Sequence, residues 1–132
     1  MKEFVLIFRM DITKEEIQTS PEQMEHYMSQ WMEWISDIEA QNRLAEGGNH
    51  LSRIGKVLKP NKVIVDEPYT MNKESVAGYI IILAEDIDRA ILIAERCPIL
   101  QGEGTSVEIR ETATPETMKK TKRVKNKLRA II

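Results

Sequence analysis

Residues 76–84 have the sequence VAGYIIILA, an apolar and β-branched run bounded by polar residues. Residues 4–8, FVLIF, are a second unbroken apolar run of strand length. Runs of this kind are typical of strands that are covered on both faces. The sequence therefore predicts a sheet with two buried strands. Each is covered on both faces by helices, or by helices on one face and a partner on the other.

Two helices are predicted between the strands. Residues 20–23, Ser-Pro-Glu-Gln, place serine at the cap, proline at the first helical position and glutamine where it closes a capping box. Apolar residues then recur every three or four positions from Met24 to Ile38, which predicts an amphipathic helix of about five turns that ends near Gly47-Gly48. Asp86 caps a shorter helix that Pro98 stops. Its inward residues are predicted to be Ile87, Ala90, Ile91, Ala94 and Cys97.

The remaining elements define the fold class. Residues 51–58 and 62–66 flank a turn at Pro60-Asn61 and predict a hairpin, and residues 106–110 alternate as a half-buried strand does. The order β-α-β-β-β-α-β predicts an α+β fold of ferredoxin-like type, with both helices on one face of an antiparallel sheet and the hairpin inserted. The other face of that sheet stays open. We therefore expect a homodimer that buries it.

Composition favours a soluble cytoplasmic protein. The chain has 132 residues, 42% of them hydrophobic and 30% charged, which is an ordinary single-domain composition. Its apolar runs are far shorter than the ~20 residues of a membrane span, and the N-terminus lacks the pattern of a signal peptide. One cysteine excludes an intrachain disulfide, which fits a reducing compartment. No membrane partner is expected.

Charge separates a body from a tail. Residues 1–114 contain 12 Lys/Arg and 20 Asp/Glu, a net charge of −8, whereas residues 115–132 contain seven Lys/Arg and one Glu, a net charge of +6. Thr114-Pro115 is a helix start, so residues 114–132 are predicted to form a basic helical extension of a domain at residues 1–113. We expect the extension to dock on the acidic body or on the partner subunit. Nucleic-acid binding is the disfavoured alternative, because the tail has no aromatic residue for stacking and the body repels phosphate.

A set of residues around position 66 identifies a family. Residues 65–69 are Val-Asp-Glu-Pro-Tyr, residues 73–74 are Lys-Glu, residues 78–79 are Gly-Tyr, and residues 94–98 are Ala-Glu-Arg-Cys-Pro. This pattern resembles the DGPF-type branch of the YCII-related proteins over about residues 1–111. The resemblance implies a ferredoxin-like domain in a dimeric α/β-barrel-like assembly, with the aspartate of the motif at a cleft. Most members of that family have no assigned reaction.

The chain also departs from the pattern of that family. Glu67 stands where the family has glycine, and Tyr69 where it has phenylalanine. Some relatives carry a histidine near the start of the first helix, which pairs with an aspartate. Here that position is occupied by Gln23. The resemblance therefore implies a ligand site more strongly than it implies a catalytic pair.

Asp66 is the principal candidate for chemistry. It lies at a strand end beside Pro68, which cannot continue a ladder. The alternative is a turn aspartate whose carboxylate accepts backbone N–H groups. Tyr69 and Lys73 lie on the polar loop that follows, where they are expected to form the rim of a ligand-binding site, although loop lysines are commonly only solvated charges.

Other polar residues add one weaker site candidate and exclude several. His50 is a second candidate, as a general base at the mouth of the site, although it is equally suited to cap an exposed strand end. Gln23 is expected to contribute from the first helix. His26 lies off the apolar stripe and should face solvent, and Cys97 lies in the inward helical phase and should be structural. The histidines and the cysteine have no zinc-site spacing, and no cofactor motif is present.

Two function classes remain open. One is a non-catalytic ligand-binding or regulatory dimer, which the missing helix histidine favours. The other is a small-molecule enzyme with acid–base or lyase-like chemistry near Asp66, since a dehydrochlorinase activity is associated with one YCII relative. The residues alone do not decide whether the protein is an enzyme.

Overall fold

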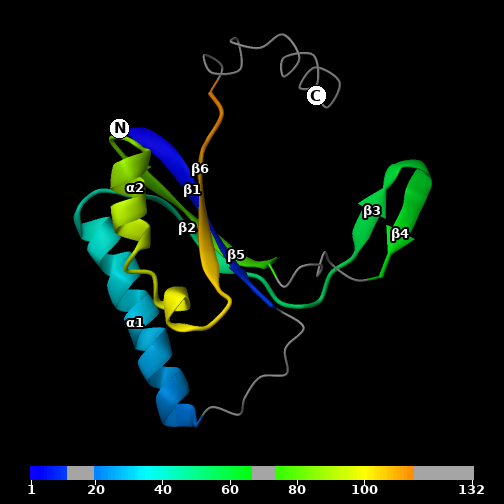
Figure 1. Cartoon of the computed structure of the whole chain (residues 1–132), viewed down its shortest axis with the longest axis horizontal. Helices are drawn as coiled ribbons and strands as arrows, with labels where there is room; N and C mark the ends of the chain where they lie inside the picture. The colour runs from blue at the N-terminus through cyan, green and yellow to red at the C-terminus, as the bar shows by residue number, and fades with distance from the viewer. Residues whose placement is uncertain (12–19, 67–73, 115–132) are drawn as a thin grey trace.

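The computed structural model describes residues 1–11, 20–66 and 74–114. These residues form an α+β fold with a four-stranded antiparallel sheet, a separate two-stranded hairpin and two α-helices (Figure 1). The elements are β1 (Lys2–Met10), α1 (Pro21–Ala40), β2 (Leu44–His50), β3 (Val57–Lys59), the 3-10 turn η1 (Pro60–Lys62), β4 (Val63–Val65), β5 (Ser75–Ala84), α2 (Ile87–Ala94), the 3-10 turn η3 (Pro98–Gln101) and β6 (Ser106–Glu111). The strand order of the larger sheet is β2-β5-β1-β6.

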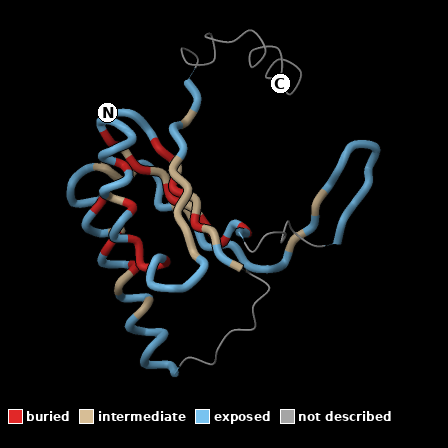
Figure 2. The backbone as a smooth tube through the Cα atoms, in the orientation of Figure 1, coloured by how far each residue is buried: buried red, intermediate tan, exposed pale blue. Residues whose placement is uncertain are grey.

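The core lies on one face of this sheet, as the sequence predicts. Alternate residues of β1 and β5 are buried there, beneath residues of both helices (Figure 2). The members of the core are Phe4, Leu6, Phe8, Trp31, Trp34, Ile38, Ile80, Ile82, Ala84, Ala90, Ala94, Cys97 and Ile99. Because α1 and α2 both contribute to this one cluster, both cover the same face (Figure 1).

The opposite face of the sheet carries no helix in the described part of the chain. Its centre consists of half-buried apolar side chains on the two central strands: Val5, Ile7, Tyr79, Ile81 and Leu83. Charged residues flank this centre, with Glu46 on β2, and Glu108 and Arg110 on β6. The apolar runs of β1 and β5 therefore supply two faces, of which only one is fully covered.

Helix α1 is shorter than the sequence predicts, because it ends at Ala40 and not near Gly47-Gly48. Asn42 adopts a left-handed conformation, with φ of 58°. Its N–H donates to the carbonyl of Glu39 at 2.9 Å, and the N–H of Arg43 donates to that of Ile38 at 3.0 Å. This is a Schellman motif with asparagine in place of the more common glycine. The chain beyond it becomes β2, which pairs with β5.

Two further details differ from the prediction. The hairpin is confined to β3 and β4, so none of residues 51–56 forms a strand. On α2, the prediction of inward residues is right for Ala90 and Ala94, but wrong for Ile87 and Ile91, which are 49% and 39% exposed. The buried stripe turns instead toward Ile93, which packs against the core. The small side chains of Ala90 and Ala94 therefore pack against the sheet, and the bulkier Ile87 and Ile91 lie at the edge of the contact between helix and sheet.

The start of α1 follows the prediction closely. Ser20 accepts a hydrogen bond from the backbone N–H of Gln23 at 3.1 Å, and the side chain of Gln23 accepts one from the N–H of Ser20 at 3.2 Å. The predicted capping box is thus confirmed.

Residues 115–132 of the predicted basic extension lie outside the described residues. No helix of the described part is long and apolar enough to cross a membrane.

The two glycines of β2 provide a matched test of this strand. A Cβ on Gly48, whose φ is 60°, would lie 1.7 Å from the carbonyl oxygen of Tyr79, whereas one on Gly47 meets nothing within 4 Å. We expect Gly48→Ala to lower the free energy of unfolding by about 2 kcal/mol or more. Gly47→Ala should change it by less than about 0.5 kcal/mol. Thermal unfolding followed by circular dichroism measures both, and equal shifts would contradict the register of β2 on β5.

Candidate functional site

One end of the sheet brings four segments together. The register places His50 of β2, Gly78 of β5, Phe8 of β1 and Val107 of β6 in one row. Gly78 makes this approach possible, because a Cβ there would lie 2.6 Å from the carbonyl oxygen of Asn49. In this row Gly78 of β5 lies between His50 and Phe8, and His50 is at the edge of the core.

Trp31 of α1 lies over this row. Its ring centroid is 5.0 Å from that of Phe8 and 4.8 Å from that of His50, both in edge-to-face orientation. Trp31 is buried, whereas His50 is exposed. The imidazole is thus in contact with a buried indole and accessible to solvent, which is the geometry expected at the mouth of a small site.

Two buried polar groups at this end of the sheet have no hydrogen-bond partner among the described residues. They are Nε1 of Trp31 and Oγ of Ser75. Ser75 begins β5 and pairs with Met10, two residues beyond Phe8 on β1. An unpaired buried donor costs about 1–3 kcal/mol, so such groups are uncommon in native cores. The second indole differs, since Nε1 of Trp34 donates to the carbonyl of Ile93 at 3.1 Å.

Asp66 lies away from this cluster in the described structure. Its side chain is 84% exposed and pairs with Nζ of Lys56 at 3.2 Å, across the base of the hairpin. An ion pair this exposed contributes little to stability. No described contact joins Asp66 to His50, so the two sequence candidates for catalysis are not brought together here. Tyr69 and Lys73 lie outside the described residues.

The described chain resumes at Glu74, immediately before β5. The carbonyl of Glu74 accepts a hydrogen bond from Nη1 of Arg9 at 2.8 Å. Arg9 also pairs with Glu108 on β6 at 2.7 Å, and the hydrogen bond from its guanidinium lowers the pKa of the Glu108 carboxyl. Arg9 therefore links Glu74, the residue before Ser75, to β6. Gln23 is engaged in the capping box of α1.

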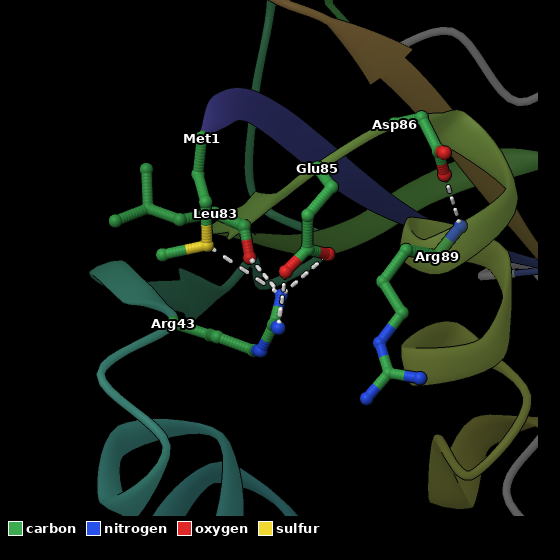
Figure 3. Close-up of polar contacts among 6 residues, drawn as sticks. All are labelled: Met1, Arg43, Leu83, Glu85, Asp86 and Arg89. Carbon is green, nitrogen blue, oxygen red and sulfur yellow. Dashed lines mark hydrogen bonds and ion pairs between the residues drawn. The ribbon is translucent and has the colours of Figure 1, made fainter.

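A groove of about 410 Å³ lies elsewhere, between α1 and α2. Near it, Arg43 binds Glu85 through two hydrogen bonds, of 2.6 and 3.1 Å (Figure 3). The hydrogen bond from Arg43 lowers the pKa of Glu85 to about 2. This exposed ion pair links the start of β2 to the end of β5.

The charges of that groove do not single out a ligand. Arg43 is neutralised by Glu85, and the other lining charges, Arg89 and Arg96 against Asp37 and Glu95, balance. Neither of the two unpartnered buried polar groups of the described chain lies in its lining. The end of the sheet at His50, where both of these groups lie, is therefore the better candidate site.

The other candidates from the sequence are structural or solvent-facing. Cys97 is buried, as predicted, and burial raises the pKa of its thiol to about 12. His26 is exposed and contacts Gln30 at 3.3 Å. Trp31 and Ser75 were not expected as site residues, because an apolar helix stripe and a strand start give no sign of an unpaired polar atom. Only the three-dimensional structure shows that these two atoms are buried without a partner among the described residues.

Comparison with known proteins identifies a family. A model of the YCII-related domain matches residues 4–113, which include most of the sheet and both helices. No curated protein matches the chain. The match is to the family as a whole, so the DGPF-type branch remains a prediction.

The environment of Cys97 leads to a reactivity test. Because its thiol is buried and its pKa lies near 12, we expect a thiol reagent such as DTNB to leave the native protein unmodified at pH 8. In denaturant, one thiol per chain should react within minutes, which serves as the control. Rapid reaction of the native protein would show that the helix end at Cys97 opens or that the residue is accessible.

Proposed function

The chain belongs to the YCII-related domain family, and on that premise we propose that it is a homodimeric domain that binds a small molecule at the His50 end of the sheet. The observation that carries the proposal is the pair of unpartnered buried groups, Nε1 of Trp31 and Oγ of Ser75. Both groups donate hydrogen bonds, so a ligand that accepts them offsets the free-energy cost of leaving them unpaired.

The neighbouring side chains define the class of ligand. The rings of Phe8 and Trp31 provide an apolar wall, and His50 adds a polar group at the solvent-exposed edge. A small molecule with an apolar part and a carboxylate or carbonyl group fits this arrangement. Because the indole N–H is fully covered, the proposal requires a neighbouring side chain to move aside when the ligand enters.

The loop from Asp66 to Glu74 is the proposed rim of the site. Its described end, Glu74, is held by Arg9, and Tyr69 and Lys73 are proposed to contribute to this rim. Gln23, at the start of α1, is proposed to contribute from the helix side. Asp66 is solvated in the described structure, and its part in binding requires the loop to bring it toward His50.

We favour binding or regulation over catalysis. A general base is usually oriented by a second group, and among the described residues the Asp66 carboxylate pairs with Lys56 and not with the imidazole of His50. The alternative, an acid–base or lyase-like enzyme that resembles a dehydrochlorinase, is supported by the exposed imidazole. It would require Asp66 and His50 to meet around a substrate.

We propose a cytoplasmic location for either function.

The homodimer is supported by the open face of the sheet. The order β2-β5-β1-β6, with one helix after β1 and one after β5, is that of a ferredoxin-like split βαβ arrangement. The uncovered face has an apolar centre and a charged margin, which is the usual anatomy of a protein interface. Stacking two such faces gives the dimeric α/β-barrel-like assembly that the resemblance implies.

The two tryptophans allow the ligand site to be tested with an internal control. In the ¹H–¹⁵N spectrum of the protein labelled at tryptophan, we expect sodium benzoate at millimolar concentration to shift the indole N–H signal of Trp31. The signal of Trp34 should stay in place, because its N–H already donates to Ile93. His50→Ala should weaken the effect. If neither indole signal moves, or if Trp34 responds as strongly as Trp31, the proposed site is wrong.

The role of Asp66 is tested with the same probe. Asp66→Asn should weaken benzoate binding about tenfold or more while leaving thermal stability unchanged, since the side chain is exposed. Asp88→Asn, an exposed substitution on α2, is the matched control. Equal affinities of the two variants would place the site away from Asp66.

The interface is tested by charge. Ile81→Lys places a cation at the centre of the open face and should convert the protein to a 15.2 kDa monomer in sedimentation velocity at micromolar concentration. Ile91→Lys, on the outer margin of α2, should remain dimeric. A monomeric wild-type protein would refute the homodimer.

A further inference from the structure

The inserted hairpin extends from the body as an arm. We define the arm as residues 51–66, which leave the sheet after His50 and contain β3 and β4. The two short strands pair through Val57 with Val65, Leu58 with Ile64, and Lys59 with Val63. The arm projects on the side of the sheet opposite to α1 and α2 (Figure 1).

The arm is apolar, but it is not part of the core. Its exposed apolar side chains are Leu51, Ile54, Leu58, Val63, Ile64 and Val65, with Ile54 at 92%, Leu58 at 72% and Ile64 at 58% exposure (Figure 2). None of them belongs to the core cluster or packs against it. Single exposed apolar residues are ordinary, but six within sixteen residues of one projecting element are typical of an interaction surface.

An isolated hairpin of this size has little stability of its own. A two-stranded hairpin is marginal in water without a third strand or a packed face. The turn adds local strain, because Asn61 and Lys62 have φ values of 67° and 60° and neither is glycine. A defined hairpin conformation at this position therefore points to a surface that covers it.

We propose that the arm of each subunit packs against a second copy of this chain. The inference rests on the homodimer proposed above, and two observations select this occupant. The first is position, since the arm and the half-buried apolar face of β1 and β5 are on the same side of the sheet (Figure 1). A second copy stacked on that face lies beside the arm, so both apolar surfaces are buried together.

The second observation is charge. The arm contains four Lys/Arg and one aspartate, a net charge of +3, whereas the remainder of residues 1–114 carries a net charge of −11. A cationic arm is therefore complementary to the body of another copy. A nucleic acid or an anionic membrane would also attract the arm, but either would meet the repulsion of the acidic body.

The test replaces the outer apolar pair of the arm. Leu58→Ser with Ile64→Ser removes two cross-strand neighbours that make no contribution to the core. Met32→Ser with Leu92→Ser is the control, because these residues are similarly exposed on the two helices. We expect the arm variant to raise the dimer dissociation constant about tenfold or more in analytical ultracentrifugation. The control should leave the dissociation constant unchanged. Both variants should remain folded, with the circular dichroism spectrum of the wild-type protein.

A positional measurement makes the inference independent of affinity. A photoreactive benzoylphenylalanine at position 58, in a mixture of ¹⁴N- and ¹⁵N-labelled copies, should give cross-linked peptides that combine both labels. The arm contact would be overturned, and the homodimer left intact, by three results together. The wild-type protein is dimeric, the cross-links from position 58 stay within one copy, and the arm variant keeps the wild-type dissociation constant. A monomeric wild-type protein would overturn both. Arm-dependent retention on DNA or phosphatidylserine vesicles, without an effect on the dimer, would assign the arm to that other partner.

Discussion

The structure depends on the fact that β1 and β5 are apolar on both faces, while the helices of the described chain cover only one. Phe4, Leu6 and Phe8 are nearly inaccessible beneath α1 and α2, and the residues between them are half-buried. Burial is worth roughly 25 cal/mol per Å² of apolar surface, so an uncovered strip of this kind favours association. At the end of the sheet near His50, Trp31 of α1 covers Phe8, while His50 itself stays exposed.

Local signals in the sequence predict the beginnings of elements better than their ends. Ser20 and Gln23 satisfy the backbone at the start of α1 by themselves, so the capping box can be predicted from four residues. The end of the helix depends on a choice between Asn42 and the pair Gly47-Gly48. Glycine is the more frequent residue in a left-handed position, which makes it the expected stop. In the structure those glycines lie within β2, and Gly48 is close against Tyr79.

The candidate site could not be predicted in the same way, because it is created by register. His50 is 19 residues from Trp31 and 42 from Phe8 in the sequence, and they meet only because β2 and β1 both pair with β5 at Gly78. Periodicity shows that Trp31 is buried, but it does not show that its indole N–H lacks an acceptor. The resemblance directed attention to Asp66, whose described contact is only a solvated pair with Lys56.

The two tryptophans show how stability and binding are separated within one helix. Trp34 and Trp31 are three residues apart and share the contact with Phe8, so they contribute comparable apolar burial. Only Trp34 has its N–H paired, with the carbonyl of Ile93 on α2. If the fold alone were optimised, a phenylalanine at position 31 would provide the ring contacts without the unpaired donor. The unpaired indole is thus a cost to the free chain that a ligand can offset, and it lies beside the accessible ring of His50.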